Sequence, residues 1–377
     1  MIGNGLGRFA YTPLIPELIG AGWLTPPQAY YAQAANFAGY LAGALVFSAL
    51  TSRMRNVVVL RVMMLLATAA LFACAIPYSF WWFAIWRLAS GLSGGVLIVL
   101  APAEVLPHVP QRKVGLSAGI IFAGVAVGIA GTGAGVPLLL HFGLVGTWIA
   151  LGAFSLLLTV IAWEGWPGDY HVPSSQPLGG SPTTSSLGVD RRLTGLFVEY
   201  ALVAMALVPH MVFIVDFVAR GLGHGVAIGS LYWIAFGLSA IGGSLTMGWL
   251  GDRVGFRMAL RLVLAIQIAV VLLPAILQTP LLLLLSTILA GALVTGSSTL
   301  VIGRIRELMH DKGEMHGRAW SIATVSFALG QAVAAYGFSW LFATTNSYAL
   351  LFACGATALG LALIIDIVTN RLPSLSI

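Results

Sequence analysis

Long apolar segments separated by short polar connections make up most of this chain. A helix that crosses a membrane needs about 20 mostly apolar residues, and the chain offers twelve segments of that kind. They cover residues 1–20, 27–50, 57–77, 80–106, 114–140, 146–163, 193–218, 225–250, 258–278, 280–303, 316–342 and 347–369. The apolar runs are continuous rather than alternating, so the pattern predicts membrane helices and not the strands of a membrane barrel.

Composition narrows the class further. Of the 377 residues, 59% are hydrophobic and only 8% are charged, whereas soluble proteins carry roughly 25% charged residues. So few charges could not cover the surface of a soluble fold of this length. This excludes a soluble enzyme, a disordered chain and a nucleic-acid-binding module, and it predicts an all-α polytopic protein whose partner is the lipid bilayer.

One long connection divides the helices six plus six. Residues 164–192 are rich in Gly, Pro, Ser and Thr, a composition typical of a flexible linker. We therefore expect an N-terminal six-helix bundle over 1–163 and a C-terminal one over 193–377. An internal repeat at an offset of about 200 residues supports this division. It matches Gly43, Leu50, Arg53, Leu60 and Arg61 with Gly243, Leu250, Arg253, Leu260 and Arg261.

The basic residues predict the orientation. With both termini in the cytoplasm, the inner side holds 15 of the 18 Lys and Arg residues, as the positive-inside rule requires. Only Arg220 falls outside, while Arg8 and Arg87 fall within spans. The first span also carries Glu17 and two prolines and begins at the first Met, so we expect the chain to start partway through a longer helix.

A charged motif follows the eighth span. Residues 248–257 read GWLGDRVGFR, which matches the G-x-L-x-D-R-x-G-x-R signature of the major facilitator superfamily. The chain resembles this superfamily over essentially its whole length. The resemblance implies a conformational latch, a set of charges that breaks and re-forms during transport. That latch would comprise Gly248, Asp252, Arg253, Gly255 and Arg257. The alternative is a solvated loop carboxylate.

The first two spans resemble one branch of that superfamily. Residues 5–16 contain the run G-R-F-A-Y-T-P-x-x-P, and residues 34–45 read AANFAGYLAGAL. Both are similar to the YbfB/YjiJ-type branch. The resemblance implies the major facilitator fold, a secondary transporter, a bacterial inner-membrane location and a monomer.

Helical spacing selects candidates for substrate binding. Polar side chains recur along one face of the first, second and eleventh spans, and a polar stripe in lipid must face protein or water. The candidates are Arg8, Tyr11, Thr12, Asn36, Tyr40, Thr324 and Gln331. The alternative for each is an interhelical hydrogen bond that only holds helices together. Because Arg presents a planar fork that suits carboxylates, Arg8 favours an anionic or carboxylate-bearing substrate.

Three titratable residues in spans are candidates for proton coupling. Arg87 heads an R-x-x-x-G pattern in the fourth span, where a charge is costly and often functional. The alternative for Arg87 is a structural role on backbone carbonyls. Glu199 and His210 are eleven residues apart in the seventh span, hence on one face and about 16 Å apart along the axis.

The remaining evidence concerns the class of function. The sequence has no clustered catalytic set and no metal-ligand set, no phosphate-binding loop for a primary pump, and no filter signature of a channel. It predicts no cofactor. We expect a secondary active transporter that moves a small organic solute by alternating access, coupled to protons. The alternative is a polytopic enzyme embedded in the membrane.

Overall fold

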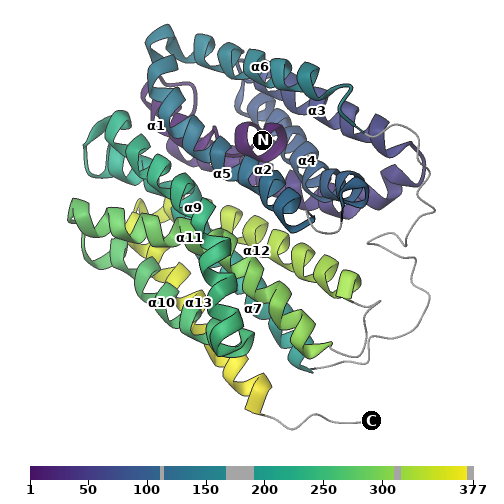
Figure 1. Ribbon diagram of the computed structural model, residues 1–377. Coiled ribbons are helices and arrows are strands. Elements are labelled where there is room, and N and C mark those ends of the chain that lie inside the picture. The colour runs from purple at the N-terminus through teal and green to yellow at the C-terminus, as the bar shows by residue number, and fades with distance from the viewer. Residues whose placement is uncertain (111–113, 167–190, 310–315, 372–377) are drawn as a thin grey trace. The chain divides into compact units, whose positions relative to one another are not determined.

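A computed structural model describes residues 1–110, 114–166, 191–309 and 316–371. Within these ranges every regular element is helical (Figure 1). The long helices are α2 (Pro26–Thr51), α3 (Asn56–Ala73), α4 (Phe80–Val105), α5 (Val114–Leu139), α6 (Gly143–Ala162), α7 (Arg191–Val208), α9 (Gly225–Val254), α10 (Phe256–Ile276), α11 (Pro280–Leu308), α12 (His316–Thr345) and α13 (Tyr348–Arg371). The predicted all-α membrane fold is therefore confirmed. The predicted linker at 164–192 lies mostly outside the described residues.

Ten helical stretches of the described chain are long and apolar enough to cross a membrane. The count differs from twelve for two physical reasons. The fifth and sixth predicted spans are the separate helices α5 and α6, but the 3-10 turn Leu140–Phe142 joins them into one continuous helical stretch, Ala123–Ala162. The first predicted span, 1–20, is not a continuous helix.

The first segment is a chain of short helical turns. A π-helix (Ile2–Leu6) is followed by turns, a 3-10 helix (Thr12–Leu14) and α1 (Ile15–Gly20). Pro13 and Pro16 have no backbone N–H to donate and therefore interrupt the regular ladder. Most of the segment is nevertheless buried, so its carbonyls need partners from other helices.

Local sequence signals begin the long helices. Thr25 and Gln28 form a capping box ahead of α2, and the Ser79 hydroxyl accepts the N–H of Trp82 at the start of α4. Gly255 adopts a φ of +81° between α9 and α10, a conformation that glycine takes without strain. The Phe256 N–H that it leaves free donates to Glu307 Oε1 at 2.8 Å.

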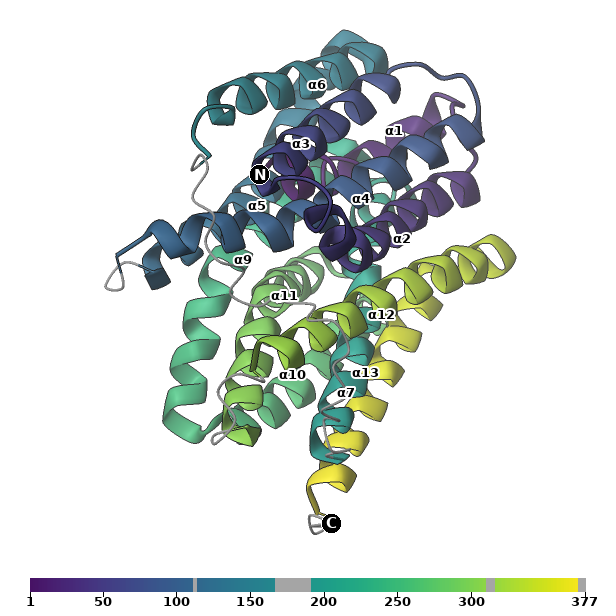
Figure 2. The ribbon, with the colours of Figure 1, turned by 90° about the vertical axis from the view of Figure 1, so that its right-hand side faces the viewer.

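The chain forms two compact units. The first contains Met1–Ser174, Val212–Leu238 and Ala335–Thr345, and the second contains Ser175–Met211, Ser239–Ala334 and Asn346–Ile377. In the second unit α7, α10, α11 and α13 pack together (Figure 2). The division at 164–192 that the sequence suggests stays a prediction.

Glycines allow close packing in the first unit. A Cβ on Gly39 or Gly43 of α2 would overlap a backbone carbonyl of α4, and one on Gly91 or Gly95 of α4 would overlap a carbonyl of α2. The helices therefore touch backbone to backbone. In the second unit a Cβ on Gly243 would meet the Ala292 carbonyl in the same way, which agrees with the repeat at an offset of 200.

Candidate functional site

Arg87 holds the interrupted first segment in place. Its guanidinium donates from Nη1 to the Gly7 carbonyl at 2.6 Å, and from Nη2 to the Arg8 carbonyl at 3.2 Å and Gln33 Oε1 at 2.5 Å. The Ser90 hydroxyl also donates to the Gly7 carbonyl, at 2.8 Å. One cation thus satisfies carbonyls that the broken helix exposes. Such contacts are the ones that a structural role for Arg87 would use, and its assignment to proton coupling stays a prediction.

Arg8 lies against three aromatic rings. Its guanidinium carbon is 4.3 Å from the ring centroid of Phe37, 4.5 Å from that of Tyr40 and 5.1 Å from that of Phe9. Such cation–π contacts stabilise a buried guanidinium without consuming an acid. Arg8 itself is 4% exposed, so its charge lies in the protein interior.

Other predicted substrate residues join the same cluster. Tyr11 is fully buried, faces the Arg87 guanidinium at 4.4 Å and donates its hydroxyl to the Ala29 carbonyl at 3.0 Å. Asn36 Nδ2 donates to the Arg87 carbonyl at 3.0 Å, and Thr12 is fully buried. Arg8, Tyr11, Asn36 and Tyr40 therefore meet around Arg87, and we call these five residues, with Gln33, the Arg87 cluster.

The two predicted residues of α12 belong to the second unit. The Thr324 hydroxyl donates to Trp320 O in its own helix at 2.9 Å. Gln331 is 1% exposed, and its Nε2 contacts the Met211 sulfur at 3.4 Å. Their assignment to substrate stays a prediction.

Glu199 and His210 lie in the interior of the second unit. Glu199 is 2% exposed, and the charges that act on it come from Asp366, Arg304 and Arg261. His210 is fully buried in a π-helical turn (Pro209–Phe213), with its Nε2 2.8 Å from the Ser286 hydroxyl. Turns of this kind inside helices often mark functional positions.

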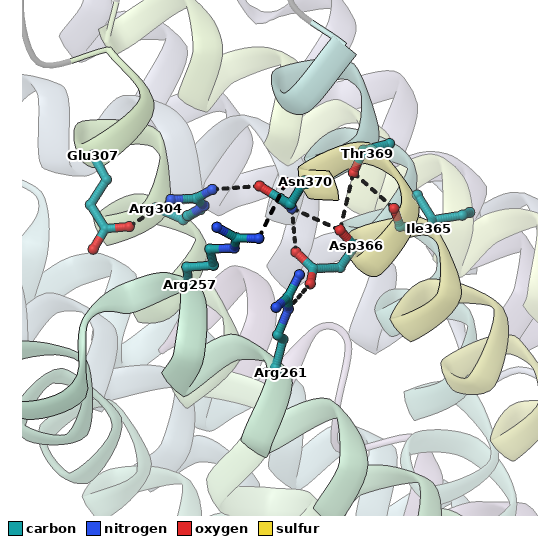
Figure 3. Close-up of polar contacts among 8 residues, drawn as sticks. All are labelled: Arg257, Arg261, Arg304, Glu307, Ile365, Asp366, Thr369 and Asn370. Carbon is teal, nitrogen blue, oxygen red and sulfur yellow. Dashed lines mark hydrogen bonds and ion pairs between the residues drawn. The ribbon is translucent and has the colours of Figure 1, made fainter. Parts of the chain in front are cut away.

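A second ionic network ties the ends of α10, α11 and α13 together (Figure 3). Arg261 pairs with Asp366, and Arg304 pairs with Glu307 at 2.8 Å. Asn370 connects the two pairs, because its Oδ1 accepts from Arg304 Nη2 at 2.7 Å and its Nδ2 donates to Asp366 Oδ1 at 2.6 Å. We call these five residues the Asp366 network.

The five residues predicted to form the latch differ in their contacts and in their exposure. Arg257 Nη2 donates to the Asn370 carbonyl at 3.3 Å, which attaches it to the Asp366 network. Arg253 stacks on Trp249 at 4.2 Å, and Asp252 is exposed. Gly255 is the positive-φ turn described above, and a Cβ on Gly248 would meet only the Thr299 side chain. The latch itself stays a prediction.

A third polar group joins α2 to the segment that follows α7. The Tyr30 hydroxyl donates to Asp216 Oδ2, and Arg220 Nη1 lies 3.2 Å from Asp216 Oδ1. Asp216 is fully buried, and Tyr30 packs on Phe213 and Phe342. Tyr30 was not identified from the sequence, since a buried tyrosine in an apolar run carries no signal of its partner.

Comparisons with known proteins agree with this architecture. The family model described as "Uncharacterised MFS-type transporter YbfB" matches residues 1–367. The chain therefore belongs to the major facilitator superfamily of transporters. Within that superfamily it is a member of the YbfB-type family, as the runs in its first two spans predicted. No curated protein matches the chain.

Solved structures share the fold. A bacterial homologue of the human lysosomal transporter Spinster, in an inward-facing and occupied conformation, superposes with a TM-score of 0.69 at 16% identity. The alignment covers 98% of this chain and 94% of that one. A D-xylose–proton symporter superposes with a TM-score of 0.71 at 15% identity, covering 97% and 95%. At such identities the likeness establishes the major facilitator fold alone.

Proposed function

We propose that this transporter moves a small organic solute by alternating access, driven by a proton gradient. The Arg87 cluster carries the proposal, because it places two buried cations, Arg8 and Arg87, beside polar and aromatic side chains. Arg87 is committed to backbone carbonyls. Arg8 rests on the rings of Phe9, Phe37 and Tyr40, and its planar guanidinium fork has the shape that suits a planar anion. We therefore assign Arg8 the contact with an anionic or carboxylate-bearing solute.

The proton-linked groups in this proposal are Glu199 and His210. Both are buried titratable side chains inside a membrane-spanning helix, where such groups commonly mark proton pathways. Arg87 stays a third candidate for proton coupling, although its guanidinium also donates to the carbonyls of the first segment.

A ligand screen tests the substrate class. Purified protein would be heated with panels of anionic, neutral and cationic organic solutes, at two pH values. We expect anions to raise the melting temperature, and more so at one pH than at the other, because a bound ligand stabilises the folded state. Stabilisation by cationic solutes alone would overturn the assignment of Arg8.

Arg8→Lys sharpens that test. A bidentate contact to a carboxylate needs the guanidinium fork, so Lys should weaken anion binding by about tenfold or more. The ring contacts accept either cation, so the melting temperature without ligand should change little. Equal binding by the two proteins would show that Arg8 does not touch the solute.

The proposed topology has both termini in the cytoplasm of a bacterial inner membrane and a monomeric chain with two six-helix halves, 1–163 and 193–377. It rests on the basic residues of the inner connections. An impermeant thiol reagent added outside should label a cysteine placed at Gly223 and spare one at Ser185. The reverse pattern would invert the topology.

A further inference from the structure

The four-helix bundle of α7, α10, α11 and α13 has an apolar interior with a few polar exceptions. Its inner part is packed by Leu196, Leu260, Val263 and Leu300, among others. Among the exceptions, Glu199, His210, Gln267 and Ser286 are at most 2% exposed, as are Thr287, Ser297 and Asp366. Buried polar side chains in such surroundings are normally hydrogen-bonded.

Gln267 is the clearest exception. It lies at the centre of the buried face of α10, between Val263 and Leu264 on one side and Val270 and Val271 on the other. Across the part of the chain that the structure describes, neither Oε1 nor Nε2 of Gln267 has a hydrogen-bond partner. An amide in that state loses all the hydrogen bonds that it makes in water, unless water accompanies it into the interior.

Other buried polar atoms of these helices share this property, among them Ser297 Oγ of α11 and Arg261 Nη2 of α10. Glu199 Oε1 and His210 Nδ1 are buried, and no described residue supplies them with a hydrogen bond. Eleven residues separate them, which puts them on one face of the helix and about 16 Å apart along its axis. Gln267 belongs to α10, and both α10 and α7 pack on α13 and α11.

The hydroxyl of Ser286 fixes the tautomer of His210. Ser286 Oγ lies 2.6 Å from the Val270 carbonyl and 2.8 Å from His210 Nε2. A hydroxyl has one proton, and the carbonyl can only accept it, so Ser286 accepts in turn from the Nε2–H of His210. The Nδ1 of neutral His210 then carries a lone pair that can receive a proton. The ring of Phe352 packs on the imidazole from α13.

Charged side chains from three other helices surround Glu199. The charged side chains that face it are Asp366 from α13, Arg261 from α10 and Arg304 from α11. Arg261 and Asp366 form an ion pair. Along α10, Gln267 comes six residues after Arg261 and three before Val270, or about 9 and 5 Å in height. It therefore lies between the level of Glu199 and the level of His210.

We propose that a file of bound water runs through this bundle from Glu199 to His210 Nδ1, held midway by the Gln267 amide, and that it carries the coupled proton. An amide offers two donors and one carbonyl, which suits the two to four partners that an internal water needs. A proton taken up at His210 Nδ1 passes to the adjacent water. Each water passes one proton on, and the carboxylate of Glu199 receives the last, leaving a neutral imidazole and a protonated carboxyl.

This inference rests on the proton coupling proposed above and assigns the path that the coupled proton takes. Gln267 acts as a positioning residue: it holds water and does not itself titrate. Its role differs from that of a packing residue, which would require no water at all.

Radiolytic footprinting tests whether the water exists. Hydroxyl radicals formed from bound water oxidise the side chains beside it, even in a protein interior. We expect Val263 and Val271 to be oxidised several times faster than Val59 and Leu60, equally buried residues of the first unit. Oxidation at the same slow rate in all four would overturn the proposal.

Two variants locate the water. Gln267→Met keeps the side-chain length without the amide and should reduce oxidation of Val263 and Val271 severalfold. Thr287→Val is the matched control, since the Thr287 hydroxyl is already bonded within α11 at 2.8 Å and its loss should leave the labelling unchanged. If Gln267→Met does not fold, the comparison within the wild-type protein still decides.

Infrared spectroscopy then tests the proton path. The stretching band of a protonated carboxyl, assigned by its loss in Glu199→Gln, should shift within seconds of transfer to heavy water. In Gln267→Met the shift should be severalfold slower. An equal rate in both proteins, or no such band at any pH, would overturn the role of Gln267 in proton transfer.

Solute-coupled proton uptake in vesicles separates the two proposals. If a solute found in the screen moves with protons and Gln267→Met transports it with unchanged proton stoichiometry and rate, the path is wrong and the proposed function stands. If water and fast carboxyl exchange are found but no proton accompanies the solute, the proposed coupling is wrong and the hydrated file remains.

Discussion

Backbone carbonyls and aromatic rings hold Arg61 and Arg87 of residues 1–163, whereas ion pairs with carboxylates hold three arginines of residues 193–377. In the first region Arg87 and Arg61 donate to backbone carbonyls, and Arg8, Arg61 and Arg87 stack on aromatic rings. In the second region the ion pairs are Arg220–Asp216, Arg261–Asp366 and Arg304–Glu307. Carbonyls and rings orient a cation without removing its charge, whereas a carboxylate cancels it.

Arg61 and Arg261 show the difference at matched positions. They are 200 residues apart, and each reaches from one helix to the end of another. Arg61 in α3 donates to the Trp163 carbonyl at 2.7 Å and stacks on the Trp163 ring at 4.9 Å. Arg261 in α10 meets the carboxylate of Asp366 in α13. The repeat thus keeps the cation and changes its partner.

The comparison suggests that the two regions have different roles in transport. A buried cation held by rings and carbonyls attracts anions, which suits the side that we propose for solute binding. Carboxylate pairs can be broken by a proton, which suits the side that we propose for coupling. The following substitutions test this contrast, from the largest expected effect to the smallest.

Arg87→Met should be the most destabilising change. It removes three charge-assisted hydrogen bonds, to the carbonyls of Gly7 and Arg8 and to the Gln33 oxygen, at about 1.5–3 kcal/mol for each. We therefore expect a loss of about 3 kcal/mol or more, although Ser90 still donates to the Gly7 carbonyl. Thermal unfolding in detergent measures it, with Arg53→Met as control, because Arg53 is exposed. An unchanged melting temperature would mean that the first segment does not depend on Arg87.

Asp366→Asn should cost less, about 1–3 kcal/mol, because it leaves Arg261 partly exposed rather than fully buried. The double variant Arg261→Met with Asp366→Leu should recover most of that loss, since an apolar pair often replaces an ion pair at little expense. Strictly additive losses in unfolding experiments would argue against a direct pair.

Tyr30→Phe should lower stability by about 1 kcal/mol, the usual value of one hydrogen bond. Asp216 accepts a hydrogen bond from the Tyr30 hydroxyl and also forms an ion pair with Arg220. Tyr31→Phe is the neighbouring control. Should both variants melt alike, the Tyr30 hydroxyl would contribute nothing to the fold.

Asp252→Asn should change stability least, within about 0.5 kcal/mol, because the side chain is exposed. If the latch operates, the variant still shifts the conformational balance, and labelling of cysteines on the two membrane faces should change in opposite directions. Wild-type labelling of both faces would leave Asp252 a solvated loop carboxylate.

The sequence predicted most of the fold because length and hydropathy suffice to locate membrane helices. Its boundaries for the helices from α2 to α4 and from α9 to α13 agree with the structure to within a few residues. The first span failed as a continuous helix because hydropathy does not register the missing N–H groups of Pro13 and Pro16.

The site was harder to predict. Spacing grouped Arg8 with Tyr11, and Asn36 with Tyr40, since residues on one helix face share a direction. Spacing could not show that Arg87 reaches the carbonyls of Gly7 and Arg8, because that contact depends on how separate helices pack. The sequence pattern did not single out Gln267 for the same reason. In the sequence it is one polar residue in an apolar run, and only its burial without a hydrogen-bond partner makes it unusual.

The bond between Arg87 and the Gly7 carbonyl spans 80 residues of chain, and this separation sets an order for biogenesis. The ribosome releases the first segment well before α4 exists. A broken helix with unpaired carbonyls is costly to place in the hydrocarbon interior of the bilayer. We expect the nascent segment to stay in a wet or protein-lined environment until α4 has been inserted. Arrested chains that end before and after residue 87 should therefore differ in whether their first segment resists extraction from the membrane.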